Sequence, residues 1–381
     1  MWKDRLERKI RIGDRLVGPG ERIFLTGEIG PAHGGSMKKA RELVRCAAEG
    51  GCDGADIVMA DPHKFIYKTL DSGRLDPFKA WEDLYLTDDQ WRELIDYGKS
   101  LGLIVYPTPL DPISVERCRK LKVEMVNINS DDVNNYLLLE QIASLGVPVT
   151  MHDIDQSLAE VEGAVQTLME NGCKDIIVLH STMETDEGDF AYDTANLNVM
   201  NTYKQAFGDL GVLAGVVEHT TSDYLIYAVA AMQPALISKH IKYDDEVEAD
   251  AGIAVKIDDL KLMNSRIRRI ERALGNAHNQ RVVNEDGTPR QRARNKVLVA
   301  NRDIKAGTII TRDDIIAKRP GDRNGLHPWF AKVLIGAKAL HDIKEDTLIH
   351  MSDFSDIQDP GYKFPEVNGY RLASGHKSMG A

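Results

Sequence analysis

The feature that most constrains the fold is a repeated alternation of short apolar runs with longer amphipathic segments. Short apolar runs are typical of strands buried on both faces, and the longer segments have helical spacing. The apolar runs span residues 22–29, 104–107, 125–129, 147–151, 176–180, 211–217 and 235–239. Strand–helix alternation repeated about seven or eight times over roughly 255 residues predicts an α/β protein with a (β/α)8 TIM barrel. A doubly wound open sheet is the alternative, although no glycine-rich dinucleotide fingerprint follows an early strand.

The alternation stops after Leu274, which indicates a second domain. Residues 276–294 are polar, with Asn-Glu-Asp-Gly-Thr-Pro at their centre, and are typical of a linker. The next 60 residues or so contain short β-type runs separated by Lys-Ala-Gly and Lys-Glu-Asp turns. The sequence therefore predicts a barrel over residues 1–275, a linker over 276–294, a small β-rich domain over 295–354 and a tail over 355–381.

Composition and charge limit the partners that we expect. The net charge of −11 argues against nucleic-acid and membrane-surface partners, because both favour basic faces. The four cysteines form no CxxC pair, and the charged N-terminus lacks the apolar core of a signal peptide. No apolar run approaches the ~20 residues of a membrane span. These features predict a cytoplasmic protein without a membrane or nucleic-acid partner.

Carboxylates and imidazoles follow most of the predicted strands. Barrel enzymes carry their working residues at the C-terminal ends of strands, so we expect these side chains to meet at one mouth. The residues are Glu28, His33, Ser130, Asp131, Asp132, His152, Asp153, His180, Glu218, His219, Lys239 and His240. Each one alone has an ordinary structural explanation, such as a buried histidine that bonds the backbone or a helix cap. As a group they predict a functional site.

Two of these residues have the chemistry of metal ligands. Neutral imidazoles at His219 and His240, on neighbouring predicted strands, can hold a divalent metal with oxygen ligands completing the shell. Such a metal polarises a carbonyl in an aldol-type addition or a hydrolysis. A nearby carboxylate, Asp132 or Glu28, would orient a water or move a proton. The spacing does not choose between these reactions.

Several motifs resemble, in the same order, those of bacterial sialic acid synthases. The segments that carry the resemblance are GDRLVGPGERIFLTGEIGPAHGG, VYPTPLD, NINSDDVNNYLLLEQIASLGVPV, IIVLHST, GVVEHTT and LISKHI. Further along, NKVLVANRDIKAGTIITRDDIIAKRPG resembles the opening of the SAF (antifreeze-like) domain that follows the barrel in that family. The matches run from Lys9 to about Phe354.

The resemblance implies a synthase that condenses phosphoenolpyruvate (PEP), or a related enol donor, with an N-acetylated amino sugar. The product would be a nine-carbon 2-keto acid of the sialic, legionaminic or pseudaminic type. The family's metal, Mn²⁺ or Mg²⁺, would be held by His219 and His240. Glu28 matches the glutamate of the family's first motif, and Asp132 matches a carboxylate thought to handle metal-bound water.

The resemblance also implies substrate contacts from further residues and an assembly. Asp250 matches an aspartate in the loop after the LISKHI motif, and Arg319 is the candidate for an SAF arginine that reaches the sugar. In the family, two chains form a domain-swapped homodimer in which the SAF domain of one subunit caps the barrel of the other. The implied ligands are small sugar and keto-acid molecules, and His180 is a further candidate substrate-binding residue.

The departures from the family concentrate where it binds phosphate. Two lysines of the family fall on Asp56 and Asn127, and His152 replaces a serine; Ser130 is the one residue of that shell that we match. Phosphate recognition needs cationic or hydroxyl donors around a dianion. The replacements predict a changed donor and leave two alternatives to the synthase. One is a metal-dependent aldolase, lyase, isomerase or hydrolase that does not use PEP, with His152 and Asp153 near the metal. The other is a non-catalytic binding protein.

Overall fold

A computed structural model describes residues 8–67, 77–182, 189–220, 224–243, 250–275, 296–319 and 325–357. The chain divides into two compact units, residues 1–278 and 279–381. The predicted linker and most of the predicted tail lie outside the described residues. No helix in the described ranges is long and apolar enough to cross a membrane.

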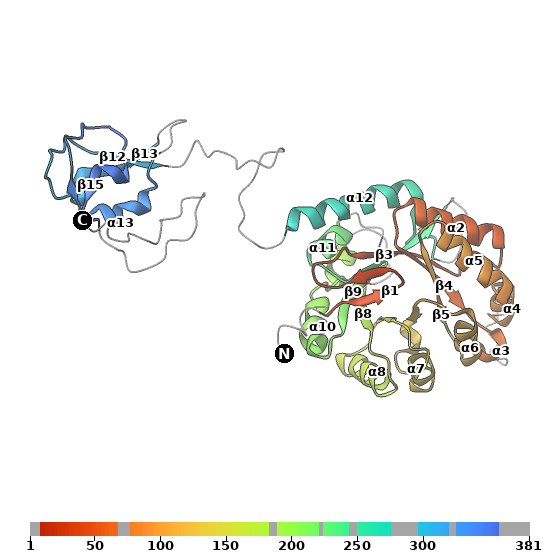
Figure 1. Ribbon diagram of the computed structural model, residues 1–381. Helices are drawn as coiled ribbons and strands as arrows, with labels where there is room; N and C mark the ends of the chain where they lie inside the picture. Colours follow the sequence, from red (N-terminus) through yellow and green to blue (C-terminus); the bar gives the residue numbers. More distant parts are fainter. Residues whose placement is uncertain are drawn as a thin grey trace. The chain divides into compact units, whose positions relative to one another are not determined.

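The first unit is a barrel of eight parallel strands surrounded by helices (Figure 1). The hydrogen-bonded order is β5-β4-β3-β10-β9-β8-β7-β6, and β5 and β6 at its two ends contact each other. The strands are β3 (Phe24–Gly30), β4 (Gly54–Met59), β5 (Ile104–Pro109), β6 (Val126–Ile128), β7 (Val149–His152), β8 (Ile176–Ser181), β9 (Leu213–Glu218) and β10 (Leu236–Lys242). A short strand, β11 (Val255–Lys256), pairs in parallel with the end of β10. The predicted TIM-barrel fold is thereby confirmed.

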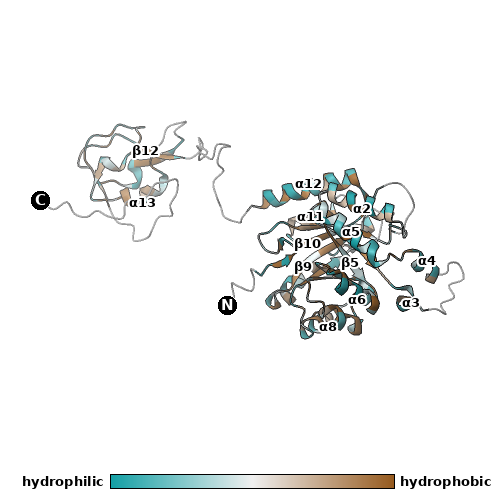
Figure 2. Ribbon diagram, turned by 45° about the vertical axis from the view of Figure 1, so that its right-hand side comes forward, coloured by the Kyte–Doolittle hydropathy of each residue, from teal (hydrophilic) through white to brown (hydrophobic). Residues whose placement is uncertain are grey.

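Amphipathic helices cover the outside of the barrel. They are α2 (Met37–Glu49), α3 (Pro62–Phe65), α4 (Pro77–Asp83), α5 (Asp88–Ser100), α6 (Pro112–Leu121), α7 (Tyr136–Ala143), α8 (Leu158–Glu170), α9 (Asp189–Thr194), α10 (Val199–Phe207), α11 (Leu225–Ala231) and α12 (Ile257–Leu274). Capping boxes at Thr87 and Ser157 fix where α5 and α8 begin. Hydrophilic and hydrophobic residues alternate along α12, as a helix with one buried face requires (Figure 2).

An N-terminal hairpin closes the end of the barrel at which the strands begin. Its strands, β1 (Ile10–Ile12) and β2 (Arg15–Val17), are antiparallel, and Ile10, Ile12 and Val17 are fully buried. These side chains join a cluster with inward-facing residues of the barrel, including Phe24 and Tyr106. The interior is therefore apolar at this end, and its polar side chains gather at the opposite end.

The second unit is small and built from two similar halves. The first half contains β12 (Val297–Ala300) and β13 (Ile315–Lys318), and the second contains α13 (Ala331–Leu334), β14 (Lys338–Ala339) and β15 (Phe354–Ser355). Ion pairs cross between the halves reciprocally, from Asp303 to Lys344 and from Lys305 to Asp342. This symmetry follows from the sequence, because ANRDIKAGTII in the first half matches ALHDIKEDTLI in the second.

Candidate metal centre

The polar end of the barrel is built by the alternation of side chains along each strand. Successive residues of a strand face opposite sides, so every second residue enters the interior. β3 and β10 pair with Thr26 beside Ser238 and Glu28 beside His240. The two strands therefore place Glu28 and His240 at the same level, where the strands end.

Glu28, His219 and His240 form a cluster with the geometry of a metal site. Their ligand atoms all lie within 4.8 Å of one another, and all three residues are buried. His240 Nε2 is 3.5 Å from Glu28 Oε1, and the two imidazole rings are 5.2 Å apart between centroids. We call these three residues the metal cluster. The structure thus brings together the two predicted ligands and adds Glu28 to them.

The electrostatics of the metal cluster suit a cation. Burial acts to raise the pKa of Glu28, but His240, His219 and His152 together with a hydrogen bond from Ser238 lower it to about 2. Ser238 Oγ donates that bond to Glu28 Oε2 over 2.9 Å. Glu28 is therefore a carboxylate at neutral pH, with its orientation fixed by Ser238.

One ring nitrogen of His219 faces a backbone carbonyl. Nδ1 lies 3.1 Å from the carbonyl oxygen of Thr182, so a protonated Nδ1 donates to that oxygen. The backbone N–H of His219 also donates to Thr182 Oγ1 over 2.7 Å. A histidine that donates from one nitrogen to a carbonyl presents the other nitrogen as a ligand. One carboxylate and two imidazoles form a donor set that fits a divalent transition metal such as Mn²⁺.

A hydrogen-bonded string of polar side chains lies on the adjoining strands. Thr108 Oγ1 donates to Asp56 Oδ1 over 2.7 Å, and Asn127 Nδ2 donates to Thr108 Oγ1 over 3.1 Å. Asn127 also accepts from Thr150 Oγ1 over 2.8 Å and lies 3.5 Å from His152 Nδ1. We call these five residues the polar string. None of its members carries a cationic ammonium or guanidinium group.

Asp56 is the unusual member of the polar string. Complete burial, and next the charge of Glu28, raise its pKa well above the ordinary value. Since Asp56 pairs with Glu28 across β3 and β4, two negative charges there would repel each other. Asp56 is therefore held as a neutral acid beside the carboxylate of Glu28.

Two other predicted site residues lie beside the metal cluster. His152 has its ring centroid 6.5 Å from that of His219 and bonds Asn129 Oδ1 through Nε2 over 3.0 Å. Burial lowers the pKa of His152 to about 4, so its imidazole is neutral. Asp250 Oδ2 is 3.9 Å from His240 Nδ1.

Ser130 and Asp132 lie in a single 3-10 turn, Ser130–Asp132, that follows β6. Both are buried, and Asp132 Oδ1 accepts a hydrogen bond from Asn135 Nδ2 over 2.8 Å. Burial raises the pKa of Asp132. Asp132 is not among the three residues of the metal cluster.

His180 is not part of the metal cluster, and Arg319 belongs to the second unit. His180 is on the outer side of β8, where its Nε2 bonds the carbonyl oxygen of Ala195 over 2.9 Å and its Nδ1 is 3.4 Å from Asp153 Oδ1. Its neighbour Asp153 accepts from Ser181 N over 2.9 Å and from the hydroxyl of Tyr203. Arg319 is exposed and follows β13 in the second unit.

Sequence reasoning missed Ser238, Thr108 and Thr150, which donate hydrogen bonds to Glu28, Asp56 and Asn127 respectively. Counting back two positions along β10 from His240 gives Ser238, so strand alternation was a sufficient signal for it. Thr108 was missed because it lies between Pro107 and Pro109, and the predicted strand ended at residue 107. Glu218 and Lys239 were noticed, but they face outward and form a buried ion pair with 2.8 Å between Lys239 Nζ and Glu218 Oε2.

Comparisons with known proteins agree with this architecture. The NeuB family model matches residues 43–279, and the SAF domain model matches residues 295–355. An uncharacterized protein of Methanocaldococcus jannaschii is 31% identical, over 91% of this chain and 98% of its own length. The N,N'-diacetyllegionaminic acid synthase of Campylobacter jejuni is 27% identical, over 86% of this chain and 99% of its own. The human N-acetylneuraminate-9-phosphate synthase is 28% identical, over 88% of this chain and 93% of its own length.

Solved structures resemble the fold at lower sequence identity. A putative spore coat polysaccharide biosynthesis protein E of Chromobacterium violaceum superposes with a TM-score of 0.74, at 21% identity, over 87% of this chain and 99% of that one. The sialic acid synthetase of Leptospira borgpetersenii gives a TM-score of 0.65 at 20% identity, over 74% of this chain and 94% of that one. With a family match over more than half of its length and a SAF domain behind the barrel, this chain belongs to the NeuB family.

Proposed function

We propose that this protein is a metal-dependent enzyme of the sialic-acid-synthase type. It joins a three-carbon enol donor to an amino-sugar aldehyde and forms a nine-carbon 2-keto sugar acid. The observation that carries the proposal is the metal cluster of Glu28, His219 and His240 at the C-terminal end of the barrel. Relatives that align over most of this chain are named as synthases of N-acetylneuraminate 9-phosphate, legionaminic acid and pseudaminic acid.

The residues of the chain have separate roles in this reaction. His219, His240 and Glu28 would hold the cation, Mn²⁺ or Mg²⁺, which supplies a Lewis acid for the aldehyde carbonyl. Ser238 fixes the carboxylate of Glu28, which is anionic. Asp250 lies beside His240 and can bind a hydroxyl of the sugar. Asp132 stays a prediction as a proton-handling residue, and Ser130 as a substrate contact.

The polar string favours a second candidate, an aldolase whose donor has no phosphate. A phosphate dianion next to Asp56 would face a neutral acid and the anionic Glu28 rather than cationic donors. The enol of a 2-keto acid such as pyruvate lacks the two negative charges that a phosphate dianion adds to its phosphorylated form. In such an aldol addition, C3 of pyruvate loses a proton and bonds the aldehyde carbon, whose oxygen takes up a proton.

An assay with two donors separates the two candidates. Purified protein with Mn²⁺ and N-acetylmannosamine is incubated with PEP or with pyruvate, and the nine-carbon product is measured by mass spectrometry. The synthase proposal predicts product from PEP with one phosphate released for each molecule formed. Product from pyruvate alone would replace the synthase by the aldolase. No product from either donor, with this aldehyde or its N,N'-diacetylated analogues, would overturn the proposal.

Matched variants link any activity to the site. His219→Gln and His240→Gln each remove one imidazole of the metal cluster, and we expect the rate to fall by at least about a hundredfold. His63→Gln changes an exposed histidine on α3 and is expected to keep the full rate. Equal activity in all three variants would show that the chemistry occurs elsewhere.

The assembly is a separate proposal. We propose that two chains form a domain-swapped homodimer in which Arg319 of the small unit contacts the sugar. Sedimentation velocity is expected to give the mass of two chains, and Arg319→Ala is expected to raise the KM for the sugar. A monomer, or an unchanged KM, would contradict this assignment. The cytoplasmic location also stays a prediction.

A further inference from the structure

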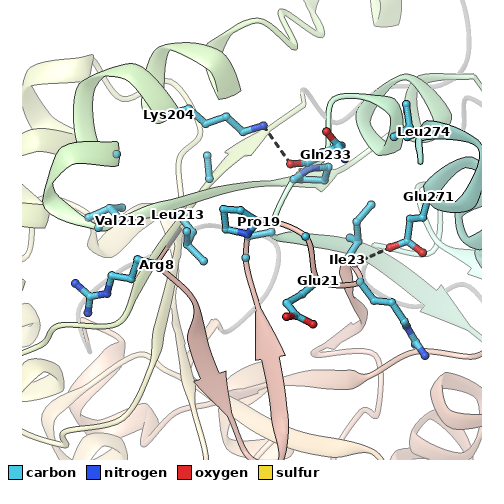
Figure 3. A pocket seen from close by; sticks show the side chains of 18 of the residues that line it. Arg8, Pro19, Glu21, Ile23, Lys204, Val212, Leu213, Gln233, Glu271 and Leu274 are labelled. Carbon is cyan, nitrogen blue, oxygen red and sulfur yellow. Dashed lines mark hydrogen bonds between the residues drawn. The ribbon is translucent and has the colours of Figure 1, made fainter. Parts of the chain in front are cut away.

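A cavity of about 730 Å³ lies at the end of the barrel opposite the metal cluster (Figure 3). Its lining includes Ile23, Leu213 and Ala235, which stand where β3, β9 and β10 begin. Glu28, His219 and His240 stand where the same strands end. Since barrel enzymes react at the C-terminal ends of their strands, an occupant of this cavity would not be a substrate of the metal cluster. We call it the lower cavity.

The walls of the lower cavity are largely apolar. Pro19 lies at the centre of the view, with Leu213 and Val212 on one side and Ile23 and Leu274 on the other (Figure 3). Its volume lies within the range of small-molecule sites, which is roughly 300–1,000 Å³. The cavity can therefore take the apolar body of a small organic molecule.

The lower cavity has more cationic than anionic side chains around it. The cationic residues are Arg8, Arg22, Lys204, Arg268 and Arg272, and the anionic ones are Glu21 and Glu271. This excess stands out in a chain with a net charge of −11. Most of these groups have partners: Arg8 pairs with Asp175, Arg22 and Arg268 with Asp53, and Glu21 with Lys9.

Lys204 and Arg272 have no carboxylate partner in the described part of the chain. The Lys204 ammonium donates to the carbonyl oxygens of Met232 over 2.7 Å and of Gln233 over 3.1 Å, just after α11 (Figure 3). An ammonium has three N–H groups, so one is left for a ligand. Burial lowers the pKa of Lys204, as expected for a cation held away from water without an anion. Arg272 is exposed in the last turn of α12.

We propose that the lower cavity binds a small organic anion, a carboxylate or phosphate ester with an apolar body, between Lys204 and Arg272. The apolar walls take the body of the molecule, and the two cations take its head group. The segment that follows Gly275 is the other available occupant. It is disfavoured by charge, because residues 276–294 contain four arginines, at 281, 290, 292 and 294, against Glu285 and Asp286.

Fluorescence titration with 8-anilinonaphthalene-1-sulfonate tests this proposal, because the probe joins an apolar body to an anionic group. The protein is treated with EDTA, so that the result does not depend on the metal cluster or on the proposed enzyme. We expect one saturable site per chain. Decanoate should displace the probe, whereas decyl maltoside, which has the same chain without a charge, should displace it far more weakly.

Variants on one helix supply the matched comparison. Arg272→Glu reverses a charge at the lower cavity and is expected to weaken probe binding about tenfold or more. Arg269→Glu makes the same change on an exposed part of α12 that does not line the cavity, and should leave binding unchanged. Lys204→Met is expected to weaken binding as well, with its melting temperature measured because it also loses two hydrogen bonds.

Two results would overturn the proposal. One is equal probe affinity in Arg272→Glu, Arg269→Glu and the unchanged protein. The other is displacement by decyl maltoside as strong as displacement by decanoate, which would show an apolar surface without anion selectivity. Neither result bears on the synthase proposal, which concerns the other end of the barrel.

Discussion

At the scale of single residues, Asp53 and Asp56 illustrate how surroundings decide the state of a buried carboxyl group. Asp53, just before β4, accepts from Arg15 over 2.6 Å and from Arg268 over 2.9 Å. Asp56, within β4, has only neutral donors and lies beside Glu28. Asp53 is therefore paired with cations, whereas burial and a neighbouring negative charge keep Asp56 neutral.

This difference predicts unequal costs for the same substitution. Asp56→Asn replaces a neutral acid by a neutral amide of the same shape, and is expected to lower the free energy of unfolding by less than about 1 kcal/mol. Asp53→Asn leaves its arginines without their buried partner, and is expected to cost about 3 kcal/mol or more. Urea denaturation of the two variants measures both values. A larger loss in Asp56→Asn than in Asp53→Asn would contradict the assigned states.

His33 predicts a pH dependence of stability. Burial lowers its pKa to about 4, and its Nε2 has no hydrogen-bond partner among the described residues. Because the unfolded chain binds this proton at about pH 6.5 and the folded chain only near pH 4, stability falls as the pH drops through this window. The loss attributable to His33 over the whole window is on the order of 3 kcal/mol.

The variant His33→Asn isolates this contribution. The amide oxygen can replace Nδ1 as the acceptor for Gly35 N, and asparagine does not titrate. We therefore expect a flatter dependence of unfolding free energy on pH between about 7 and 4.5, compared with His63→Asn at an exposed position. The same slope in both variants would show that His33 does not contribute.

At the scale of elements, the N-terminal hairpin should stabilise the barrel. Ile12 is completely buried at the closed end, whereas Leu16, on the facing strand, is 41% exposed. Ile12→Ala is expected to lower the free energy of unfolding by about 2–5 kcal/mol, and Leu16→Ala by no more than about 1 kcal/mol. Denaturation curves of the two variants compare them directly. Similar small losses would mean that the hairpin packs only loosely.

The sequence predicted helices well because their surfaces are amphipathic and their ends carry caps. Residues 37–49 and 88–100, for example, have helical spacing in the sequence and form α2 and α5. β4 was not among the apolar runs, because Asp56 interrupts the run in a barrel whose interior is polar at that level. The sequence did not predict the β1–β2 hairpin, because strands of three residues give little periodic signal.

The site was predictable in its residue types but not in its geometry. His219 and His240 end neighbouring strands and point inward, as expected from the barrel. His180 also ends a strand, but it occupies an outward-facing position of β8. An uncertainty of one residue in the predicted strand leaves open which of its residues face the interior. The hydrogen bond that Asp56 accepts comes from Thr108 on β5, which lies far from it in the sequence.

At the scale of the whole molecule, the two ends of the barrel have separate chemistry. The C-terminal end holds the metal cluster and the polar string, and the N-terminal end is closed by the hairpin and contains the lower cavity. The small unit has its own hydrophobic core and its own reciprocal ion pairs. The proposed reaction depends above all on a cation held at the metal cluster.

A titration with Mn²⁺ tests that claim most directly. The bound ion is measured by the loss of the electron paramagnetic resonance signal of free Mn²⁺. We predict one Mn²⁺ per chain, binding abolished in His219→Asn and His240→Asn, weakened in Glu28→Gln, and unchanged in His180→Asn, a buried histidine outside the cluster. Unchanged binding in His219→Asn and His240→Asn, or no Mn²⁺ bound by the unaltered protein, would contradict the account.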